Sequence, residues 1–327
     1  MSKALKGSWD TIIILLTVLA IVIASAGVPN FGTSRNFTFL ILDLLPIVLI
    51  ALPMTLIIVT GEIDLSVASI LGLTSSLMGW FWNNGLSIEM IIPLVVVIGA
   101  IAGVFNGFLV NSLGLPSLAV TIGTLALYRG LAFVVLGDGA VADFPFDYTA
   151  WVTGTIAGGP VPNVLILIVA LAIVFGVVLH ATPFGRSLYA IGANDKAAHF
   201  AGIPVARTKF WLYVASGAVA GLVGILWTLR YSSARADNGS GLELAVVAAV
   251  LLGGVSIFGG KGSLPGVLAG VVLLATLQNA LRLQDVSGQA LNIVTGTLLV
   301  LSVLLPNLAS SIRTTWQRRR RRQAPAS

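Results

Sequence analysis

The sequence predicts an all-helical, polytopic membrane protein with about ten transmembrane helices, arranged as two halves of inverted topology. Three observations predict this fold class: the high share of apolar residues, their grouping into long runs, and the uneven distribution of basic residues between the loops. Hydrophobic residues make up 57% of the 327-residue chain and charged residues only 9%. Average soluble domains contain about 25% charged residues. Lipid must therefore cover much of the surface.

Ten apolar runs supply the expected helices, because a bilayer core of about 30 Å needs about 20 helical residues. They are residues 11–28, 38–60, 64–82, 90–111, 117–136, 163–181, 210–230, 243–258, 264–282 and 290–308. No cleavage-site pattern follows the first run, so we expect it to be retained as a helix. One transmembrane domain, residues 11–309, then lies between a cytoplasmic segment, 1–10, and a basic cytoplasmic tail, 310–327.

The basic residues favour an orientation with both termini in the cytoplasm. With alternating helices, four of the 18 basic residues lie on the outer side, namely Arg35, Arg230, Arg235 and Arg282, and Arg129 lies within a span. The other thirteen are cytoplasmic: Lys3, Lys6, Arg186, Lys196, Arg207, Lys209, Lys261, Arg313 and Arg318–Arg322. We interpret the five-arginine run as a segment that contacts anionic lipid rather than nucleic acid.

The second half of the chain repeats a pattern of the first. Asn106 precedes Gly123-Thr124-Leu125 by seventeen residues, and Asn279 precedes Gly296-Thr297-Leu298 by the same spacing. The two patterns fall on helices that run in opposite directions, which predicts an inverted repeat of the kind common in transporters. Each is preceded by an interrupted apolar run, residues 59–66 and 252–263, as expected of irregular backbone near a cavity or interface.

Several chemistries are excluded by the residues themselves. The chain has no cysteine and two widely separated histidines, so we expect no disulfide and no metal site. It also lacks a phosphate-binding G-x-x-x-x-G-K-[ST] loop. The Gly259–Ser263 segment lacks the first glycine of that motif. We expect no catalytic residues and no cofactor, and any ATP hydrolysis must occur in another chain.

Charged and polar residues within the spans are the candidate pathway residues, because burying them in lipid is costly. Asp64 and Ser66 are placed to cap a restarting helix, and we favour this structural role for Asp64 over contact with a solute. The candidate pathway residues combine amide, hydroxyl and guanidinium groups with an aromatic face, which suit a sugar. They are Phe105, Asn106, Ser69, Arg129 and Asn279.

Two segments together resemble the sugar permease subunits of bacterial ABC importers, the family of ribose, xylose, rhamnose and autoinducer-2 permeases. Residues 61–69, Gly-Glu-Ile-Asp-Leu-Ser-Val-Ala-Ser, are similar to the family's G-x-I-D-L-S-V-G-S signature, with Ala68 in place of glycine. Residues 182–203 are similar to its cytoplasmic T-x-F-G-R…A-I-G-x-N…A-A…A-G-I segment, although His199 and Phe200 replace the commoner Arg and Leu. The resemblance covers the chain from the second apolar run to the tenth.

The resemblance implies a type II ABC importer-like fold in a bacterial inner membrane, with a signature at Gly61, Glu62, Asp64 and Ser66. It also implies a coupling segment at about 182–209 that contacts an ATPase subunit. The coupling residues it implies are Gly185, Arg186, Asn194, Asp195, Ala197, Ala198, Gly202 and Ile203. Asn194 or Asp195 can cap a short helix there. The implied partners are ATPase subunits that use ATP and Mg, an extracytoplasmic solute-binding protein, a second permease copy or paralogue, and membrane lipid.

The solute is best assigned as a monosaccharide or sugar-like compound, with rhamnose or a pentose first because of the Gly-Glu-Ile-Asp-Leu-Ser variant. Autoinducer-2 and branched-chain amino acids remain alternatives within related importers. An ion-coupled secondary transporter, with Glu62 and Asp64 as the ion relay, is the alternative from another class.

Overall fold

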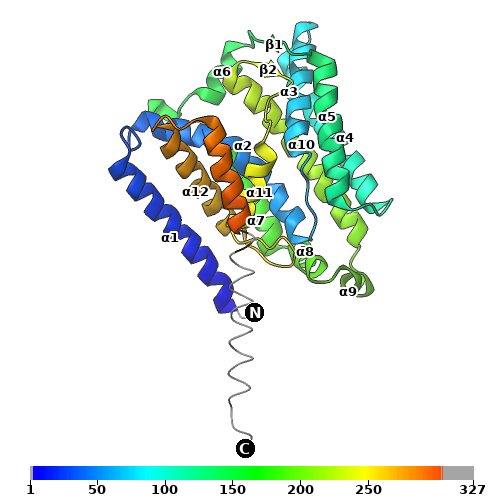
Figure 1. The fold of residues 1–327 in the computed structure, drawn as a ribbon. Coiled ribbons are helices and arrows are strands. Elements are labelled where there is room, and N and C mark those ends of the chain that lie inside the picture. Colours follow the sequence, from blue (N-terminus) through cyan, green and yellow to red (C-terminus); the bar gives the residue numbers. More distant parts are fainter. Residues whose placement is uncertain (1–2, 303, 305–327) are drawn as a thin grey trace, which may run out of the picture.

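The computed structural model describes residues 3–302 and 304, and in this part of the chain the regular structure is almost entirely helical (Figure 1). Two short strands, β1 (Ala140–Val141) and β2 (Ala234–Arg235), pair antiparallel. The helices are α1 (Lys3–Gly27), α2 (Ser34–Val59), α3 (Val67–Asn83), α4 (Ile88–Asn111), α5 (Ser117–Leu136), α6 (Phe146–Thr153), the 3-10 turn η1 (Ile156–Gly158), α7 (Val164–Ala181), α8 (Pro183–Ala193), α9 (Asp195–Phe200), α10 (Val205–Tyr231), α11 (Leu242–Leu252), α12 (Leu264–Arg282) and Gly288–Ser302. The predicted all-helical membrane class is confirmed.

Each of the ten predicted runs contains a helix, but among the described residues only seven helices are long and apolar enough to cross a membrane. These are α1 from Trp9, α2, α4, α5, α7, α10 and α12. The predicted run 243–258 is wrong at its end, because α11 stops at Leu252. Gly253 follows it, and Gly254 has φ +90°, a backbone conformation that ends the helix. The eleven residues of α11 extend only about 16 Å.

The start of the last helix also differs from the start of the tenth predicted run. The end of that run and the basic tail cannot be compared with the structure. The last helix begins at Gly288 and is described to Ser302. Apart from residue 304, the remainder of the run to 308 and the tail 310–327 lie outside the described residues.

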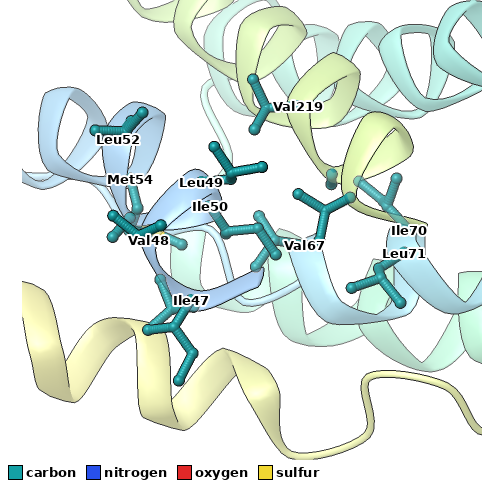
Figure 2. Packing of buried hydrophobic residues seen from close by; sticks show 14 of the residues in the cluster. Ile47, Val48, Leu49, Ile50, Leu52, Met54, Val67, Ile70, Leu71 and Val219 are labelled. Atoms are coloured by element: carbon teal, nitrogen blue, oxygen red, sulfur yellow. The ribbon is translucent and has the colours of Figure 1, made fainter. Parts of the chain in front are cut away.

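Helix α2 forms the centre of the bundle. Leu49, Ile50, Ala51 and Leu52 are completely buried, and nearly all of the helix beyond Leu40 has little exposure. Figure 2 shows Leu49 and Ile50 beside Val67 of α3 and Val219 of α10. By contrast, α1, α7 and one face of α4 and of α5 expose large apolar side chains. A buried central helix with exposed apolar helices around it is the arrangement expected when lipid is the solvent.

Helices α4 and α10 approach each other closely through glycines. A Cβ atom on Gly99 or Gly103 would collide with backbone atoms of α10, and one on Gly217 would collide with backbone atoms of α4. Small residues at a membrane helix interface allow this backbone contact, because packing rather than water drives the association there.

The two ends of the bundle differ in charge and structure. We call one the basic end, defined by α8, α9 and the loop 253–263, which carries Arg186, Lys196 and Lys261. We call the other the strand end, defined by β1, β2 and α6. In Figure 1 the two ends lie on opposite sides of the helices.

The packing of the helices agrees with two inverted halves. Helix α10 packs against α3 and α4, and α2 packs against α11 and α12. A shift of 173 residues brings α3, α4 and α5 onto α11, α12 and the Gly288–Ser302 helix. The directions are opposite: α4 finishes at the basic end with Asn111, whereas α12 finishes at the strand end with Arg282.

Candidate functional site

A cluster of buried polar side chains occupies the break between α2 and α3, and we call it the polar junction: Asp64, Ser66, Asn106, Tyr128 and Ser216. The Asp64 carboxylate accepts hydrogen bonds from the Ser66 hydroxyl at 2.6 Å, the Ser66 amide at 3.1 Å and the Ser216 hydroxyl at 2.9 Å. The Asn106 amide donates to the Ser66 hydroxyl at 2.7 Å, and the Tyr128 hydroxyl contacts the Asn106 carbonyl oxygen. Asp64 and Asn106 are completely buried. The junction therefore joins α4, α5 and α10 to the signature segment.

The predicted helix cap is wrong in its detail. Ser66 is the residue before α3, but neither its side chain nor that of Asp64 accepts from the first-turn amides of that helix. Asp64 instead folds back on the Ser66 amide, a local turn that Asp side chains commonly make. The structural role assigned to Asp64 is thus carried by the turn and by Ser216 of α10.

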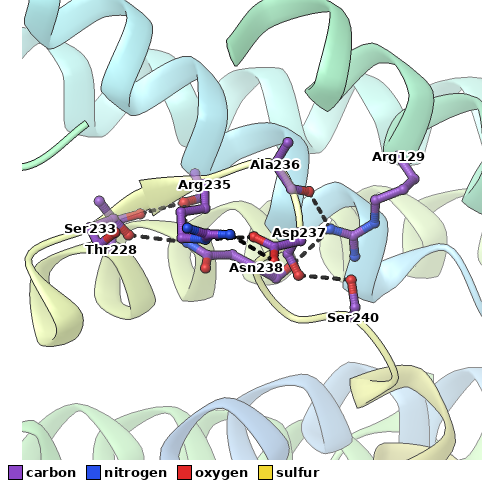
Figure 3. Close-up of polar contacts among 9 residues, drawn as sticks. Arg129, Thr228, Ser233, Arg235, Ala236, Asp237, Asn238 and Ser240 are labelled. Carbon is purple, nitrogen blue, oxygen red and sulfur yellow. Dashed lines mark hydrogen bonds and ion pairs between the residues drawn. The ribbon is translucent and has the colours of Figure 1, made fainter. Parts of the chain in front are cut away.

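Arg129 connects α5 to the strand end. Its guanidinium donates to the carbonyl oxygens of Ala236 at 2.5 Å, Asn238 at 2.9 Å and Ala68 at 3.1 Å. Figure 3 shows the side chain directed at the 236–238 segment, beside the Arg235–Asp237 ion pair. The hydrogen bond from Arg235 lowers the pKa of Asp237, so this carboxylate is charged at neutral pH. Arg129 therefore holds the loop between α10 and α11 in place.

A cavity of about 410 Å³ lies at the strand end, and we call it the strand-end cavity. Its wall is formed by α2, α10, α11, α12, the Gly288–Ser302 helix and the loop before α11. Asp43 of α2 forms ion pairs with Arg230 of α10 and, at 2.8 Å, with Arg282 of α12. Trp227, Asn238, Gln278, Asn279 and Asn292 also line it. Of the predicted pathway residues, Asn279 is the one that borders this cavity.

The basic end carries the helical hairpin α8–α9. The predicted cap is confirmed at Asn194, whose side chain accepts from the Ala197 amide at 3.0 Å. Helix α9 ends at Phe200, just before Gly202. Sequence reasoning missed that residues 183–193 form a helix of their own, α8, which is capped by Thr182. Ala198 packs inward, whereas Phe200 is 88% exposed and extends from the last turn of α9. The hairpin therefore exposes an apolar side chain at the basic end.

Three segments that are far apart in the sequence meet at α8 of this hairpin. We call their contact the glycine joint, and it consists of Gly61, Gly192, Gly259 and Gly260. A Cβ atom on Gly192 of α8 would collide with the Val59 carbonyl oxygen and the Gly260 amide nitrogen. The Gly260 amide donates to that same carbonyl oxygen at 2.8 Å. Both interrupted apolar runs thus contact α8 through backbone atoms.

A second cavity, of about 580 Å³, separates α9 from α4, α5 and α10, and we call it the basic-end cavity. Glu62 of the signature segment and Lys209 of α10 form an ion pair of 2.5 Å in its wall. Asp195, His199 and Phe200 of α9 face it from the opposite side. The two segments that resemble the permease family therefore share one cavity, a proximity that their spacing in the sequence did not predict.

The structure does not bring the predicted pathway residues together. Ser69 is buried and donates to the Ser66 carbonyl oxygen, next to the polar junction that contains Asn106. Phe105 is 43% exposed on the outer face of α4. Asn279 pairs with Asn36 of α2 at 2.9 Å. The pathway role of these residues stays a prediction.

Of the residues that sequence reasoning missed, Arg230 and Ser216 gave no pattern that would single them out. Gly192 could have been found, because it lies within the family-like Ala-Ile-Gly-Ala-Asn sequence.

Comparison with known proteins extends this description to the whole chain. Residues 36–303 match the family described as "Branched-chain amino acid transport system / permease component". The "Autoinducer 2 import system permease protein LsrD" of Photorhabdus temperata is 32% identical, over 97% of this chain and 98% of that protein. The LsrD protein of Yersinia enterocolitica is 33% identical, over 88% and 90% of the two chains. No solved structure matches the chain.

Both matches cover most of this chain. The names of these relatives mention autoinducer-2, an alternative solute at the sequence level, and do not mention rhamnose. The chain is therefore a member of the branched-chain amino acid transport system permease family, and it is an ABC-type permease.

Proposed function

We propose that this chain carries a small sugar-like solute across a bacterial inner membrane by alternating access, driven by separate ATPase subunits docked on the α8–α9 hairpin. Autoinducer-2 is the first candidate solute, because the relatives at 32–33% identity are named for its import. The observation that carries the proposal is the hairpin itself. It is a capped, two-helix projection that exposes Phe200 and contacts both interrupted runs of the membrane domain.

The ends of the bundle are assigned by charge. We place the basic end in the cytoplasm and the strand end outside, where a solute-binding protein would deliver the solute. Asp138, Asp143 and Asp147 in the loop around β1 agree with an outer position, since this loop has no basic residue. A second permease copy or paralogue would complete the pathway, and Mg and ATP would be bound by the ATPase partner.

The contacts of Glu62 and Asp64 support ATP coupling over an ion relay. A relay needs carboxylates that exchange protons or cations with water. Asp64 is completely buried with three hydrogen-bond donors around it, and Glu62 is held by Lys209. Both carboxylates are already engaged in contacts between helices.

Uptake of labelled autoinducer-2 by cells that express the complete importer tests the proposal. We expect uptake to stop when the ATPase subunit carries a substitution of its phosphate-binding lysine. Uptake should continue when the proton gradient is collapsed with ATP maintained. Uptake that persists without a working ATPase, or that follows the proton gradient, would contradict ATP coupling. A parallel assay with labelled rhamnose, ribose and leucine identifies the solute.

A further inference from the structure

The strand-end cavity differs from the other hollow of similar size near this end of the bundle. The cavity between α4, α6, α7 and α10, of about 420 Å³, is lined mostly by apolar residues such as Ile92, Leu222 and Leu226. The strand-end cavity has a similar volume, about 410 Å³, but its wall carries charged, amide and aromatic groups. Sites for small molecules have volumes of about 300–1,000 Å³ and a few convergent polar groups. The strand-end cavity has both properties.

The charges in its wall are largely balanced against one another. Asp43 is paired with Arg230 and Arg282, and Asp237 is paired with Arg235. A bound anion would have to approach Asp43, and a bound cation would meet the surplus guanidinium charge. A neutral solute with several hydroxyl groups can instead accept from the guanidinium and amide groups and donate to carbonyl and carboxylate oxygens. The wall chemistry therefore fits a neutral, polyhydroxylated solute.

Of the two arginines that pair with Asp43, Arg282 is the one that can give up this contact and bind a solute instead. Arg230 is 9% exposed in its side chain, also donates to the Leu42 carbonyl oxygen, and lies 4.8 Å from the Tyr231 ring centre. Arg282 is 56% exposed and is bound to Asp43 through one nitrogen. Asp43 keeps its contact with Arg230 if Arg282 moves away. The exchange therefore leaves no unpaired carboxylate in the wall, which would be the costly outcome.

Aromatic surface is available beside these groups. Trp227 lines the cavity, and its ring lies 5.3 Å from that of Tyr231, which also lines it. Sugars present faces of C–H groups that pack on aromatic rings, while their hydroxyl groups bond to neighbouring amides. Gln278 and Asn292 also line the cavity with amide groups, and the Gln278 amide donates to the Thr295 hydroxyl at 2.9 Å.

We infer that the strand-end cavity is a contact site for the transported solute and that it takes neutral polyhydroxylated compounds. When the solute binds, Arg282 releases Asp43 and donates its hydrogen bond to the solute instead. The inference rests on the proposed transport function and on the outer position of the strand end. It names a site that lies within one permease chain, between α2, α10, α12 and the Gly288–Ser302 helix.

Cysteine protection in the complete importer tests it, and the absence of native cysteine in this chain makes each introduced thiol unique to it. Asn292→Cys places a thiol at an exposed position in the cavity wall, and Asn84→Cys places one at the exposed strand end outside the cavity. We expect a membrane-impermeant maleimide to label both. Autoinducer-2, or the sugar that the uptake assay identifies, should slow labelling of Asn292→Cys about threefold at twice its dissociation constant. It should leave Asn84→Cys unchanged.

Arg282→Gln tests the exchanging residue, with Arg35→Gln as the matched control. Arg35 is also an exposed arginine at the strand end, but it lies over the Phe39 ring and does not line the cavity. Loss of a charged hydrogen bond predicts an apparent KM for the solute about tenfold higher in Arg282→Gln. Arg35→Gln should keep the wild-type KM.

If the solute does not slow the labelling of Asn292→Cys in a preparation that transports this solute, the inference is overturned. The proposed function is not affected by that result. Equal KM changes in the two arginine variants would also overturn it, because they would indicate a general effect of surface charge on docking of the binding protein. If the wild-type importer transports no sugar-like solute at all, the proposed function itself fails.

Discussion

At the scale of single residues, Asp64 is a completely buried carboxylate in the signature segment. It has no exposed surface, and three donors from two helical segments converge on its two oxygens. A buried carboxylate in a membrane protein is costly unless such donors satisfy it. The signature segment 61–69 is therefore explained in this chain by the need to terminate α2 and restart α3 within the bundle. The Asp64 oxygens are the acceptors that this irregular backbone requires.

Two substitutions at Asp64 separate this role from ion transport. Asp64→Ala leaves the Ser66 amide and two hydroxyl groups without their acceptor, and we expect it to lower the free energy of unfolding by about 1–3 kcal/mol for each unsatisfied donor. Asp64→Asn keeps one acceptor oxygen for Ser66 and has nearly the same shape. It should fold and retain most uptake activity. Thermal unfolding in detergent and uptake rates measure the two effects.

An ion relay predicts the opposite result for Asp64→Asn, namely loss of uptake. A neutral amide cannot bind or release a proton, so Asp64→Asn would then fold normally and transport nothing. That result would replace the structural role of Asp64 with a catalytic role in ion coupling.

At the scale of elements, the central observation is that α8 contacts both broken helices through backbone atoms. Gly192 lies against Val59 at the end of α2 and against Gly260 in the loop between α11 and α12. The Tyr189 hydroxyl of α8 also donates to the Gly262 carbonyl oxygen at 2.9 Å. A displacement of the α8–α9 hairpin must therefore move the ends of both interrupted runs, because no flexible side chain lies between the backbones at Gly192.

Gly192→Ala tests this contact. The methyl group would collide with the Val59 carbonyl oxygen and the Gly260 amide, so we expect overpacking to cost about 1–3 kcal/mol. Solute uptake per ATP hydrolysed should fall, because the hairpin can no longer seat against both runs. The ratio of uptake to ATPase rate in the reconstituted importer measures the coupling.

The matched control is Gly123→Ala in α5, where a Cβ atom would meet no neighbour within 4 Å. Alanine is favoured over glycine within a helix by about 1 kcal/mol, so this variant should be neutral or more stable. Normal coupling in Gly192→Ala, with the chain still folded, would show that the joint does not transmit the motion.

At the scale of the whole molecule, the sequence predicted the helices and their order because hydropathy and length determine which segments cross a membrane. The run 117–136 coincides with α5, and 264–282 with α12. The run 243–258 was drawn too long because Val255, Ile257 and Phe258 continue the apolar composition past Gly253 and Gly254. The interruption that the sequence predicted at residues 252–263 begins where α11 ends.

The candidate site was less predictable for a different physical reason. Its contacts join residues such as Asp43 and Arg230, or Gly61 and Gly259, that lie more than a hundred positions apart. Their proximity depends on which helix faces meet, and a single sequence does not contain that information. The Asn194 cap was predictable because its partner, Ala197, is three residues away.

The orientation of the whole bundle gives the last prediction, and it again uses the absence of native cysteine. Single thiols are introduced by Asp138→Cys in the loop before β1 and by Lys196→Cys on α9; both positions are exposed and at opposite ends of the bundle. In intact cells an impermeant maleimide should label Asp138→Cys at once and Lys196→Cys only after the inner membrane is permeabilised. The reason is the positive charge retained on the cytoplasmic side during insertion. The reverse pattern would place the α8–α9 hairpin outside the cell, where no ATPase can reach it, and would exclude both the docking surface and the outer position of the strand-end cavity.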